Sequence, residues 1–224
     1  FVQGWELYQK IIAHNYMNHG EVIATLRIIA GEQAGGDPKI LEVGCGDAFV
    51  VSRTFAESAR LNYTGVDMSE HALEYARKNL MQPNRAIDLR IGNMFDVVEQ
   101  LKGKFDLILA GYSLHHFGAD RKAILLKRFK PLLKPGGVLI VYDIFTPDGE
   151  ARAEYLERIL THCRAAWSEM DASQMESIHE HVRNNDYPES IGSMERLAKE
   201  AGYGSFDCRY RDADEFYGVT TMTV

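Results

Sequence analysis

Apolar and polar residues follow two different periods along the chain, and the alternation of these periods predicts strands separated by helices. Short apolar runs that end in a turn or an acidic residue predict strands at residues 39–43, 63–67, 88–91, 105–110 and 138–143. Between these runs, apolar residues recur at spacings of three and four, which predicts helices at residues 49–59, 70–80, 95–101 and 119–133. Strands and helices that alternate at such lengths indicate an α/β fold with a parallel sheet.

Helical patterns also flank this alternating region. Residues 1–36 carry apolar and aromatic side chains at helical spacing, with a break near His19, and Gly35 to Pro38 ends the region. Residues 146–187 interrupt the alternation with a second helical stretch, and residues 193–201, 205–210 and 216–224 then predict a helix and two strands. The length of 224 residues suits one domain, so we expect a single domain that spans residues 1–224.

The most informative stretch is residues 40–49, where an apolar strand enters a turn that contains Gly44 and Gly46. Two glycines let the chain reverse tightly and let a ligand approach the backbone where a Cβ would clash. A dinucleotide site begins in the same way, but here Glu42 stands two residues before the first glycine and Ala48 takes the third small position. The turn therefore predicts a site for a nucleotide-like ligand.

Together with four later landmarks, this loop resembles the class I S-adenosylmethionine-dependent methyltransferases. The landmarks are a second strand ending at Asp67, a third followed by Asn93, a fourth ending at Ala110, and the turn 135–137 before the fifth strand. The resemblance implies a Rossmann-like, seven-stranded, mostly parallel sheet with an antiparallel last strand. It also implies an N-terminal helical lid (residues 1–36), a helical cap insertion after the fifth strand (146–187), and S-adenosyl-L-methionine as cofactor, with S-adenosyl-L-homocysteine as product.

The same resemblance gives the early landmarks their roles in cofactor binding. Glu42 is expected at the methionine end of the cofactor, although a buried acid paired with the amides of the glycine loop would look the same in sequence. Gly44 and Gly46 bring the backbone close to the cofactor. Asp67, an acid at the end of an apolar strand, is expected to accept both ribose hydroxyls.

Later positions are expected to hold the adenine. Asn93 takes a position where many relatives have Asp, and Met94 follows it as an apolar contact. Met68 either packs on the adenine face or fills the core. Tyr8 from the lid and Ala110 from the fourth strand complete the expected cofactor set.

The fourth strand continues into Leu114-His115-His116-Phe117, which resembles small-molecule methyltransferases and lacks the Asn-Pro-Pro-Tyr type sequence of DNA-adenine and protein-glutamine methyltransferases. We therefore expect His115 where the methyl group leaves the cofactor, with His116 directed into the structure. His19 and Tyr16 from the lid are expected to meet His115 at the acceptor, as the catalytic set. His115 and His19 act there as general bases or only position the acceptor, and a purely structural histidine is the third interpretation.

A second polar group lies in the cap insertion, at His179, His181, Asp186 and Tyr187. Histidines and acids from separate segments can bind a metal ion if they converge. The spacing of two residues does not place both histidines on one face of a helix, so we predict no metal site.

Composition narrows the partners and the location. The net charge of −7 argues against nucleic acid as a partner, and the basic residues between positions 122 and 134 suit a solvent-facing helix. Three cysteines without C-x-x-C spacing indicate neither a disulfide framework nor a zinc site. No apolar run approaches the ~20 residues of a membrane span, so we expect no membrane partner and a cytoplasmic location. The oligomeric state is open between a monomer and a homodimer.

Three functions fit these observations. The first is methyl transfer to a small-molecule acceptor at an undetermined oxygen, nitrogen, sulfur or carbon atom. The second is a relative of tRNA-modification enzymes that alters S-adenosylmethionine itself, which needs a cation for the added carboxylate, with Arg183 as the candidate. The third is a non-catalytic, cofactor-binding partner protein.

Overall fold

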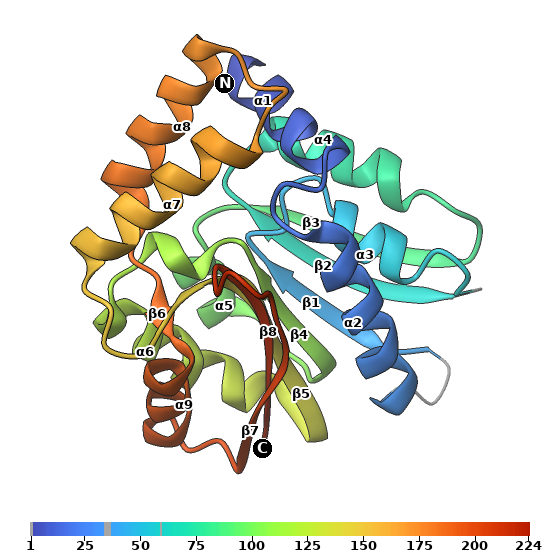
Figure 1. The fold of residues 1–224 in the computed structure, drawn as a ribbon. Coiled ribbons are helices and arrows are strands. Elements are labelled where there is room, and N and C mark those ends of the chain that lie inside the picture. The colour runs from blue at the N-terminus through green and yellow to red at the C-terminus, as the bar shows by residue number, and fades with distance from the viewer. Residues whose placement is uncertain (1, 34–36, 59) are drawn as a thin grey trace.

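The computed structural model describes residues 2–33, 37–58 and 60–224, and it consists of one sheet with helices on both faces (Figure 1). The strands are hydrogen-bonded in the order β3-β2-β1-β4-β5-β8-β7, and the short β6 pairs with β5. Pairs among β1 to β5 are parallel, whereas β8 is antiparallel to β5 and β7. The expected mostly parallel sheet with an antiparallel last strand is confirmed, with β6 as an addition. The strand bounds are β1 (Lys39–Val43), β2 (Leu61–Asp67), β3 (Arg85–Ile91), β4 (Phe105–Gly111), β5 (Leu133–Thr146), β6 (Glu189–Ser190), β7 (Ser205–Arg211) and β8 (Tyr217–Thr223).

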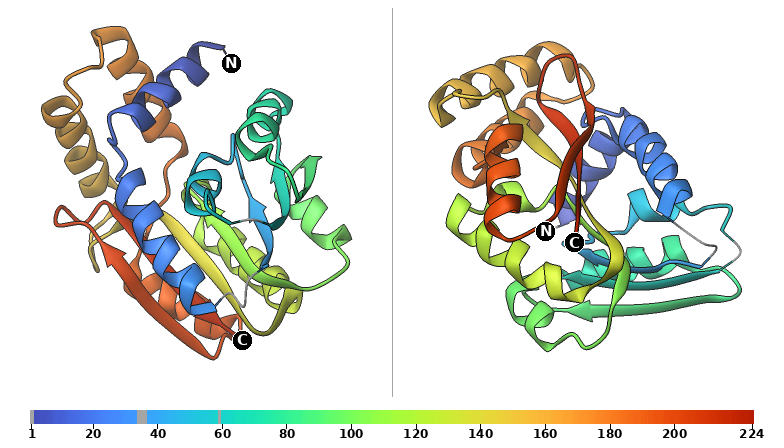
Figure 2. Two further views of the ribbon diagram at one scale, coloured as in Figure 1. Left: turned by 90° about the vertical axis from the view of Figure 1, so that its right-hand side faces the viewer. Right: turned by 90° about the horizontal axis from the view of Figure 1, so that it is seen from below.

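The two faces of the sheet are covered by different helices, as the two views in Figure 2 show. One face packs against α2 (His19–Gln33), α3 (Phe49–Thr54) and α4 (Glu70–Leu80). The other face packs against α5 (Met94–Gln100), α6 (Ala119–Phe129) and α9 (Ile191–Glu200). Consecutive residues of β1 serve opposite cores, Ile40 the first and Leu41 the second. Because both faces are buried, the central strands are continuous apolar runs in sequence.

Three further helices form a separate cluster beside the sheet, α1 (Val2–Ala13), α7 (Arg152–Ala166) and α8 (Ala172–Asn185) (Figures 1 and 2). Their apolar core contains Tyr155, Ile159 and Trp167, with Leu7 and Ile11 of α1 packed against it. Helix α1 thus packs on α7 and α8, although these helices lie far apart in the sequence. None of the described helices is long and apolar enough to cross a membrane.

Some helix boundaries lie where the local sequence predicts them, and others do not. Ser69 caps α4 as expected, since its Oγ accepts from the Ala72 amide at 3.2 Å. The N-terminal break lies immediately before His19, where α2 begins. The helix expected at 49–59 ends at Thr54, and the helix expected at 119–133 ends at Phe129. The second error has a clear cause: Pro131 lies in the 3-10 helix η2 (Lys130–Leu132) and lacks the N–H that an α-helix needs there.

Candidate active site

A cavity of about 470 Å³ is lined by residues at the carboxyl ends of β1, β2 and β4 and by the glycine loop. Ala110 does not line it, because its side chain is fully buried in the core on the α5–α6 face. The following residues, Gly111 and Tyr112, line the cavity instead, which corrects the expectation for Ala110. The other eight expected cofactor residues line the cavity: Tyr8, Glu42, Gly44, Gly46, Asp67, Met68, Asn93 and Met94.

The glycine loop forms one wall of this first cavity with its backbone. Gly44 and Gly46 have φ values of +66° and +52°, in the left-handed region that favours glycine. A Cβ on Gly44 would lie 2.7 Å from Cβ of Ser113, whereas a Cβ on Gly46 would meet no atom within 4 Å. Gly44 is therefore required by packing as well as by conformation, and Gly46 leaves open space for a ligand.

The carboxylate of Asp67 joins the two turns beside the cavity. Its Oδ2 accepts from the Gly46 amide and its Oδ1 accepts from the Ser69 amide, both at 2.8 Å. A carboxylate has about four acceptor positions, so both oxygens can still accept hydroxyl protons from a ligand in the cavity.

Glu42 is buried below the glycine loop and accepts two phenolic hydrogen bonds. The hydroxyl of Tyr63 lies 2.5 Å from Oε2, and that of Tyr142 lies 2.6 Å from Oε1. Burial raises the pKa of Glu42 to about 7, although the two hydroxyls favour the ionised form. The hydrogen-bond donors to Glu42 are thus tyrosines of β2 and β5. The amides of the glycine loop, which the sequence offered as alternative partners, do not fill this role.

Two of the residues expected at the adenine, Met68 and Asn93, lie in the turns that follow β2 and β3. Asn93 is the N-cap of that helix, and its Oδ1 accepts from the Phe95 amide at 2.9 Å. Met68 is 71% exposed and lines the cavity, so it does not fill the core.

A second cavity, of about 460 Å³, lies between the α1–α7–α8 cluster and the carboxyl ends of β4 and β5. Most of its lining is apolar, including Ile159 and Ile178, and a polar group at one side contains His115, His116, His181 and Asp186. Tyr8, Tyr112 and His116 line both cavities. The two cavities therefore meet at these three side chains.

Tyr112 is a residue that the sequence did not single out. Its φ of +44° is uncommon for a bulky residue, and its hydroxyl donates to the backbone carbonyl of Met17. Such strained positions concentrate at functional sites. A tyrosine after an apolar strand carries no sequence signal of this conformation, because the contact with Met17 depends on the tertiary structure.

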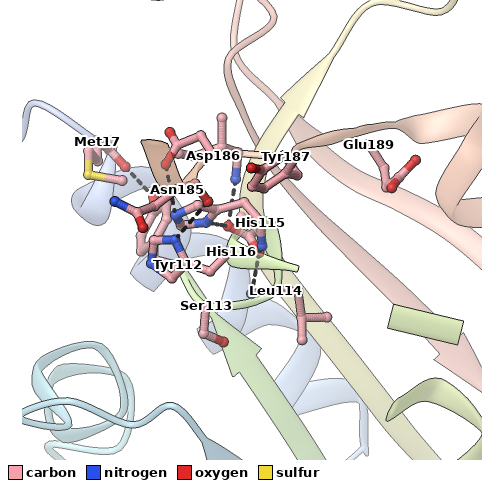
Figure 3. A network of polar contacts seen from close by, with 12 residues as sticks. Met17, Tyr112, Ser113, Leu114, His115, His116, Asn185, Asp186, Tyr187 and Glu189 are labelled. Atoms are coloured by element: carbon pink, nitrogen blue, oxygen red, sulfur yellow. Dashed lines mark hydrogen bonds and ion pairs between the residues drawn. The ribbon is translucent and has the colours of Figure 1, made fainter. Parts of the chain in front are cut away.

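His115 lies between two carboxylates, those of Asp143 and Asp186. Figure 3 shows His115 beside Asp186. Its Nδ1 is 2.5 Å from Oδ1 of Asp143 on β5, and its Nε2 is 3.8 Å from Oδ1 of Asp186 at the end of α8. The amides of Leu114 and His115 donate to Oδ2 of Asp143 and hold it in place. Burial alone would lower the pKa of His115, but Asp143 and then Asp186 raise it overall, which favours the imidazolium.

His116 corrects a second expectation. It does not point into the structure but is exposed and lines both cavities. The 3-10 helix η1 (Leu114–His116) has about three residues per turn, so consecutive side chains point in directions about 120° apart. His115 consequently faces the interior and His116 the cavities.

The two lid residues of the expected catalytic set do not line either cavity. Tyr16 stacks on Trp167, with ring centroids 5.1 Å apart, and its hydroxyl accepts from the Glu169 amide. His19 is buried against Tyr8 and Tyr112, and burial lowers its pKa to about 4. We therefore correct both assignments: Tyr16 fastens the lid to α7, and His19 is a neutral ring beneath the residues that line the cavities.

Of the four polar residues of the cap, Asp186 and His181 lie beside the histidines of η1, whereas His179 and Tyr187 line neither cavity. One ligand atom each of His115, His116 and Asp186 lies within 4.8 Å of the others, a spacing that a divalent ion could bridge. A metal would first have to displace the proton that Asp143 and Asp186 favour on His115. His181 packs edge-on against His116 at 5.3 Å.

The other two cap residues are directed elsewhere. His179 is buried outside the two cavities. The ring of Tyr187, which also lines neither cavity, lies 4.4 Å from the guanidinium carbon of Arg152. Its backbone amide donates to the carbonyl of His115 at 2.7 Å.

Cationic side chains are scarce around the two cavities. Arg183 lines neither cavity and lies 3.8 Å from Glu176. Arg121 lines the first cavity, where its guanidinium lies over the rings of Phe95 and Phe117. Within the described ranges, no Lys or Arg lines the second cavity.

Comparison with known proteins agrees with this geometry. Residues 41–139 match the family model described as a methyltransferase domain. A carboxy-S-adenosyl-L-methionine synthase of Shewanella piezotolerans is 23% identical over 206 residues, which are 89% of this chain and 82% of the relative. A ubiquinone biosynthesis O-methyltransferase of Pseudomonas aeruginosa is 31% identical over 114 residues, which are 50% of this chain and 47% of the relative.

Solved structures share the fold at lower identity. An O-methyltransferase of Nostoc punctiforme, titled as putative, matches with a TM-score of 0.66 and 18% identity over 96% of this chain. A cyclopropane synthase of Mycobacterium tuberculosis matches with a TM-score of 0.57 and 21% identity over 83% of this chain. The chain covers 59% and 62% of the lengths of these two proteins.

Proposed function

We propose that this chain is a class I S-adenosylmethionine-dependent methyltransferase that transfers a methyl group to a small molecule in the second cavity. The observation that carries the proposal is the meeting of the two cavities at Tyr8, Tyr112 and His116. A donor in the first cavity and an acceptor in the second would then face each other across these side chains.

The residues of the first cavity fit S-adenosylmethionine. Asp67 offers acceptor oxygens for ribose hydroxyls, and Met68, Asn93 and Met94 offer apolar and amide contacts for a base. Glu42 is an acid that becomes ionised near neutral pH, which suits a ligand with an ammonium group. When bound, the cofactor supplies an electrophilic methyl group on a sulfonium.

The chain has to align the acceptor with that methyl group and exclude water, because the transfer is an in-line displacement. The acceptor would be held by the apolar wall of the second cavity and by His115 and Asp186 on its polar side. In this proposal residues 146–187 act as a cap that determines acceptor specificity, while residues 1–36 act as a lid across both cavities.

The relatives named carboxy-S-adenosyl-L-methionine synthase favour a second candidate, in which the chain carboxylates the cofactor itself. The carboxylate added to the cofactor needs a positively charged side chain that binds it. The described lining of the second cavity contains no Lys or Arg, and Asp143 and Asp186 surround the His115 imidazolium. We therefore favour methyl transfer over this candidate. The intact set of Gly44, Gly46 and Asp67 in the first cavity favours an enzyme over a partner protein without catalysis.

Calorimetry with S-adenosylmethionine, followed by transfer of its labelled methyl group into a metabolite extract, separates these functions. We expect donor binding and a labelled small molecule. Mass spectrometry of the cofactor pool would reveal a carboxylated donor, which would support the second candidate. Binding without turnover across broad extracts would support the partner protein.

A pair of variants tests the assignment of the second cavity to the acceptor. Ile178→Trp should narrow this cavity and strongly reduce methyl transfer while donor affinity stays within about twofold. Tyr187→Ala lies on the same cap but lines neither cavity, and should leave both quantities unchanged. A large loss of donor affinity in Ile178→Trp would contradict the assignment.

A further inference from the structure

We propose that the second cavity binds an elongated, uncharged hydroxyl compound whose oxygen lies between His115 Nε2 and Asp186 Oδ1, and whose far end accepts a hydrogen bond from Trp167. The proposal rests on the proposed function and names its class of acceptor. Two buried polar atoms that lack hydrogen bonds, at opposite ends of one apolar cavity, carry the argument.

The first of these atoms is Oδ1 of Asp186. The residue is 1% exposed, and its other oxygen, Oδ2, accepts from the Tyr155 hydroxyl at 3.2 Å. Oδ1 has no hydrogen-bond partner within the described chain, and its charged neighbour, His115 Nε2, is 3.8 Å away. Leaving a buried carboxylate oxygen without a donor is costly, so a donor from the ligand is expected at this position.

The gap of 3.8 Å also limits which ligand group fits. An oxygen about 2.8 Å from both Nε2 and Oδ1 subtends an angle of about 85° and can form a hydrogen bond with each. A hydroxyl group accepts from the Nε2 proton and donates to Oδ1 at the same time. An ammonium cannot accept from Nε2, and a carboxylate cannot donate to Oδ1.

The second atom is the indole Nε1 of Trp167, which lines the same cavity and is 5% exposed. Its N–H has no acceptor among the described residues, and stacking on Tyr16, with 4° between the planes, holds the ring. Trp167 follows α7 and Asp186 follows α8, so the two residues lie at opposite ends of this helical hairpin. A carbonyl or ether oxygen at the far end of the ligand would satisfy the indole.

The wall between these ends determines the body and charge of the ligand. Ile159, Ile178 and Val182 line it and favour an apolar or aromatic body. Asp143 and Asp186 flank the one histidine between them, and no described Lys or Arg lines the cavity. A carboxylate or phosphate ligand would therefore lack a counter-charge.

In the transfer step, the hydroxyl oxygen forms a bond to the methyl carbon while the carbon–sulfur bond of the donor breaks. The electron pair of that bond stays on sulfur and gives S-adenosylhomocysteine. The hydroxyl proton passes to Asp186 Oδ1, whose pKa is raised by burial, and the product is a methyl ether. Asp186 is then a catalytic residue, and His115 positions the oxygen without giving up a proton.

The test measures binding in the presence of S-adenosylhomocysteine, which occupies the first cavity and prevents turnover. The probes are 4-hydroxybenzophenone, its 4-methoxy analogue and 4-benzylphenol, which lacks the ketone, each titrated by calorimetry against the wild-type chain. We expect 4-hydroxybenzophenone to bind, and each analogue to bind about five- to thirtyfold more weakly because one hydrogen bond is lost.

Variants then assign the two ends. Asp186→Ala leaves no acceptor oxygen and should remove the preference for the hydroxyl over the methoxy compound, and Trp167→Phe should remove the preference for the ketone over 4-benzylphenol. Asp214→Asn, an exposed aspartate that lines neither cavity, is the matched control and should retain both preferences.

Three results would overturn the proposal: no binding of 4-hydroxybenzophenone, equal affinities of the three probes, or loss of binding with EDTA, which would indicate a metal at the histidines. Because the probe series is measured on the wild-type chain, a variant that fails to fold does not decide the outcome. Failure of the proposed function has a different signature, since then S-adenosylhomocysteine would not bind or the bound hydroxyl probes would not be methylated by S-adenosylmethionine.

Discussion

Buried neighbours determine the charge state of the acids at this site. Glu42 and Asp143 are both almost fully buried, yet their pKa values move in opposite directions. Glu42 has two neutral tyrosine donors, so burial dominates and raises its pKa. Burial also favours the neutral form of Asp143, but the imidazolium of His115 lowers its pKa overall. A residue type in the sequence therefore does not define its charge at this site.

The pKa of about 7 for Glu42 predicts a pH-dependent contribution to stability. Because this value lies above the ordinary 4.5, the folded protein holds the proton more tightly than the unfolded chain. The stabilising contribution is complete below about pH 4.5 and is lost as the pH rises through about 7, by up to about 3 kcal/mol. Glu42→Gln should therefore raise the melting temperature relative to wild type at pH 8, and much less at pH 4.5. An equal difference at both pH values would contradict the raised pKa.

The assignment of Asp67 to the ribose predicts a loss of donor affinity. Asp67→Ala removes a carboxylate whose hydrogen bonds contribute ~1.5–3 kcal/mol each, so affinity for S-adenosylmethionine should fall more than tenfold. Asp67→Asn keeps one acceptor oxygen and should lose less. Calorimetry measures both, and circular dichroism checks that the fold is retained. Asp88→Ala, on the edge strand β3, is the control. Unchanged donor affinity in Asp67→Ala would disprove the ribose contact.

Most residues that line the first cavity lie in short loops and turns at the ends of strands. The glycine loop after β1, the turn after β2, η1 after β4 and the start of α5 each contribute residues to the first cavity or to its boundary with the second. Their positions follow from the parallel order of β1 to β4, because the carboxyl ends of parallel strands share one edge of the sheet. Precise contacts within these turns then decide which substitutions are tolerated.

The contact between Gly44 and Ser113 predicts an interaction between two of these elements. Gly44→Ala should lower stability by more than Gly46→Ala, because both have positive φ but only the Cβ at Gly44 meets another Cβ at 2.7 Å. In the double variant Gly44→Ala/Ser113→Gly the clash is removed, and about 1 kcal/mol of backbone strain should be left. Chemical denaturation of the wild type, Gly44→Ala, Ser113→Gly and the double variant measures this coupling. Additive effects of the two substitutions would show that the clash is absent.

At the scale of the whole molecule, α1 joins the two cavities. Tyr8 lines both of them, and Tyr16, which follows α1, stacks on Trp167 at the end of α7. Helices α1, α7 and α8 therefore form one unit over the edge of the sheet (Figure 2). Ligand binding in either cavity should restrict the motion of this unit.

Hydrogen exchange tests that coupling. S-adenosylhomocysteine should slow amide exchange in residues 6–13, because it would contact Tyr8 and stabilise α1 against local opening. Tyr8→Ala should reduce this protection, with affinity for the ligand measured in parallel so that occupancy is equal. If exchange in α1 is the same with and without ligand, α1 does not act as a lid on this timescale.

The sequence by itself determined the sheet, its covering helices and the glycine loop, because these depend on local periods and on residues a few positions apart. Glu42, Gly44 and Asp67 could be assigned to one cavity, since strand ends meet at one edge in any parallel sheet. The existence of the second cavity and the residues that line it could be found only from the tertiary structure. His115, Asp143 and Asp186 meet because α8 packs against η1 and β5. Tyr16 stacks on Trp167 and His19 packs against Tyr8 and Tyr112, so neither of them lines a cavity. Such contacts depend on side-chain packing between distant segments, which no local pattern records.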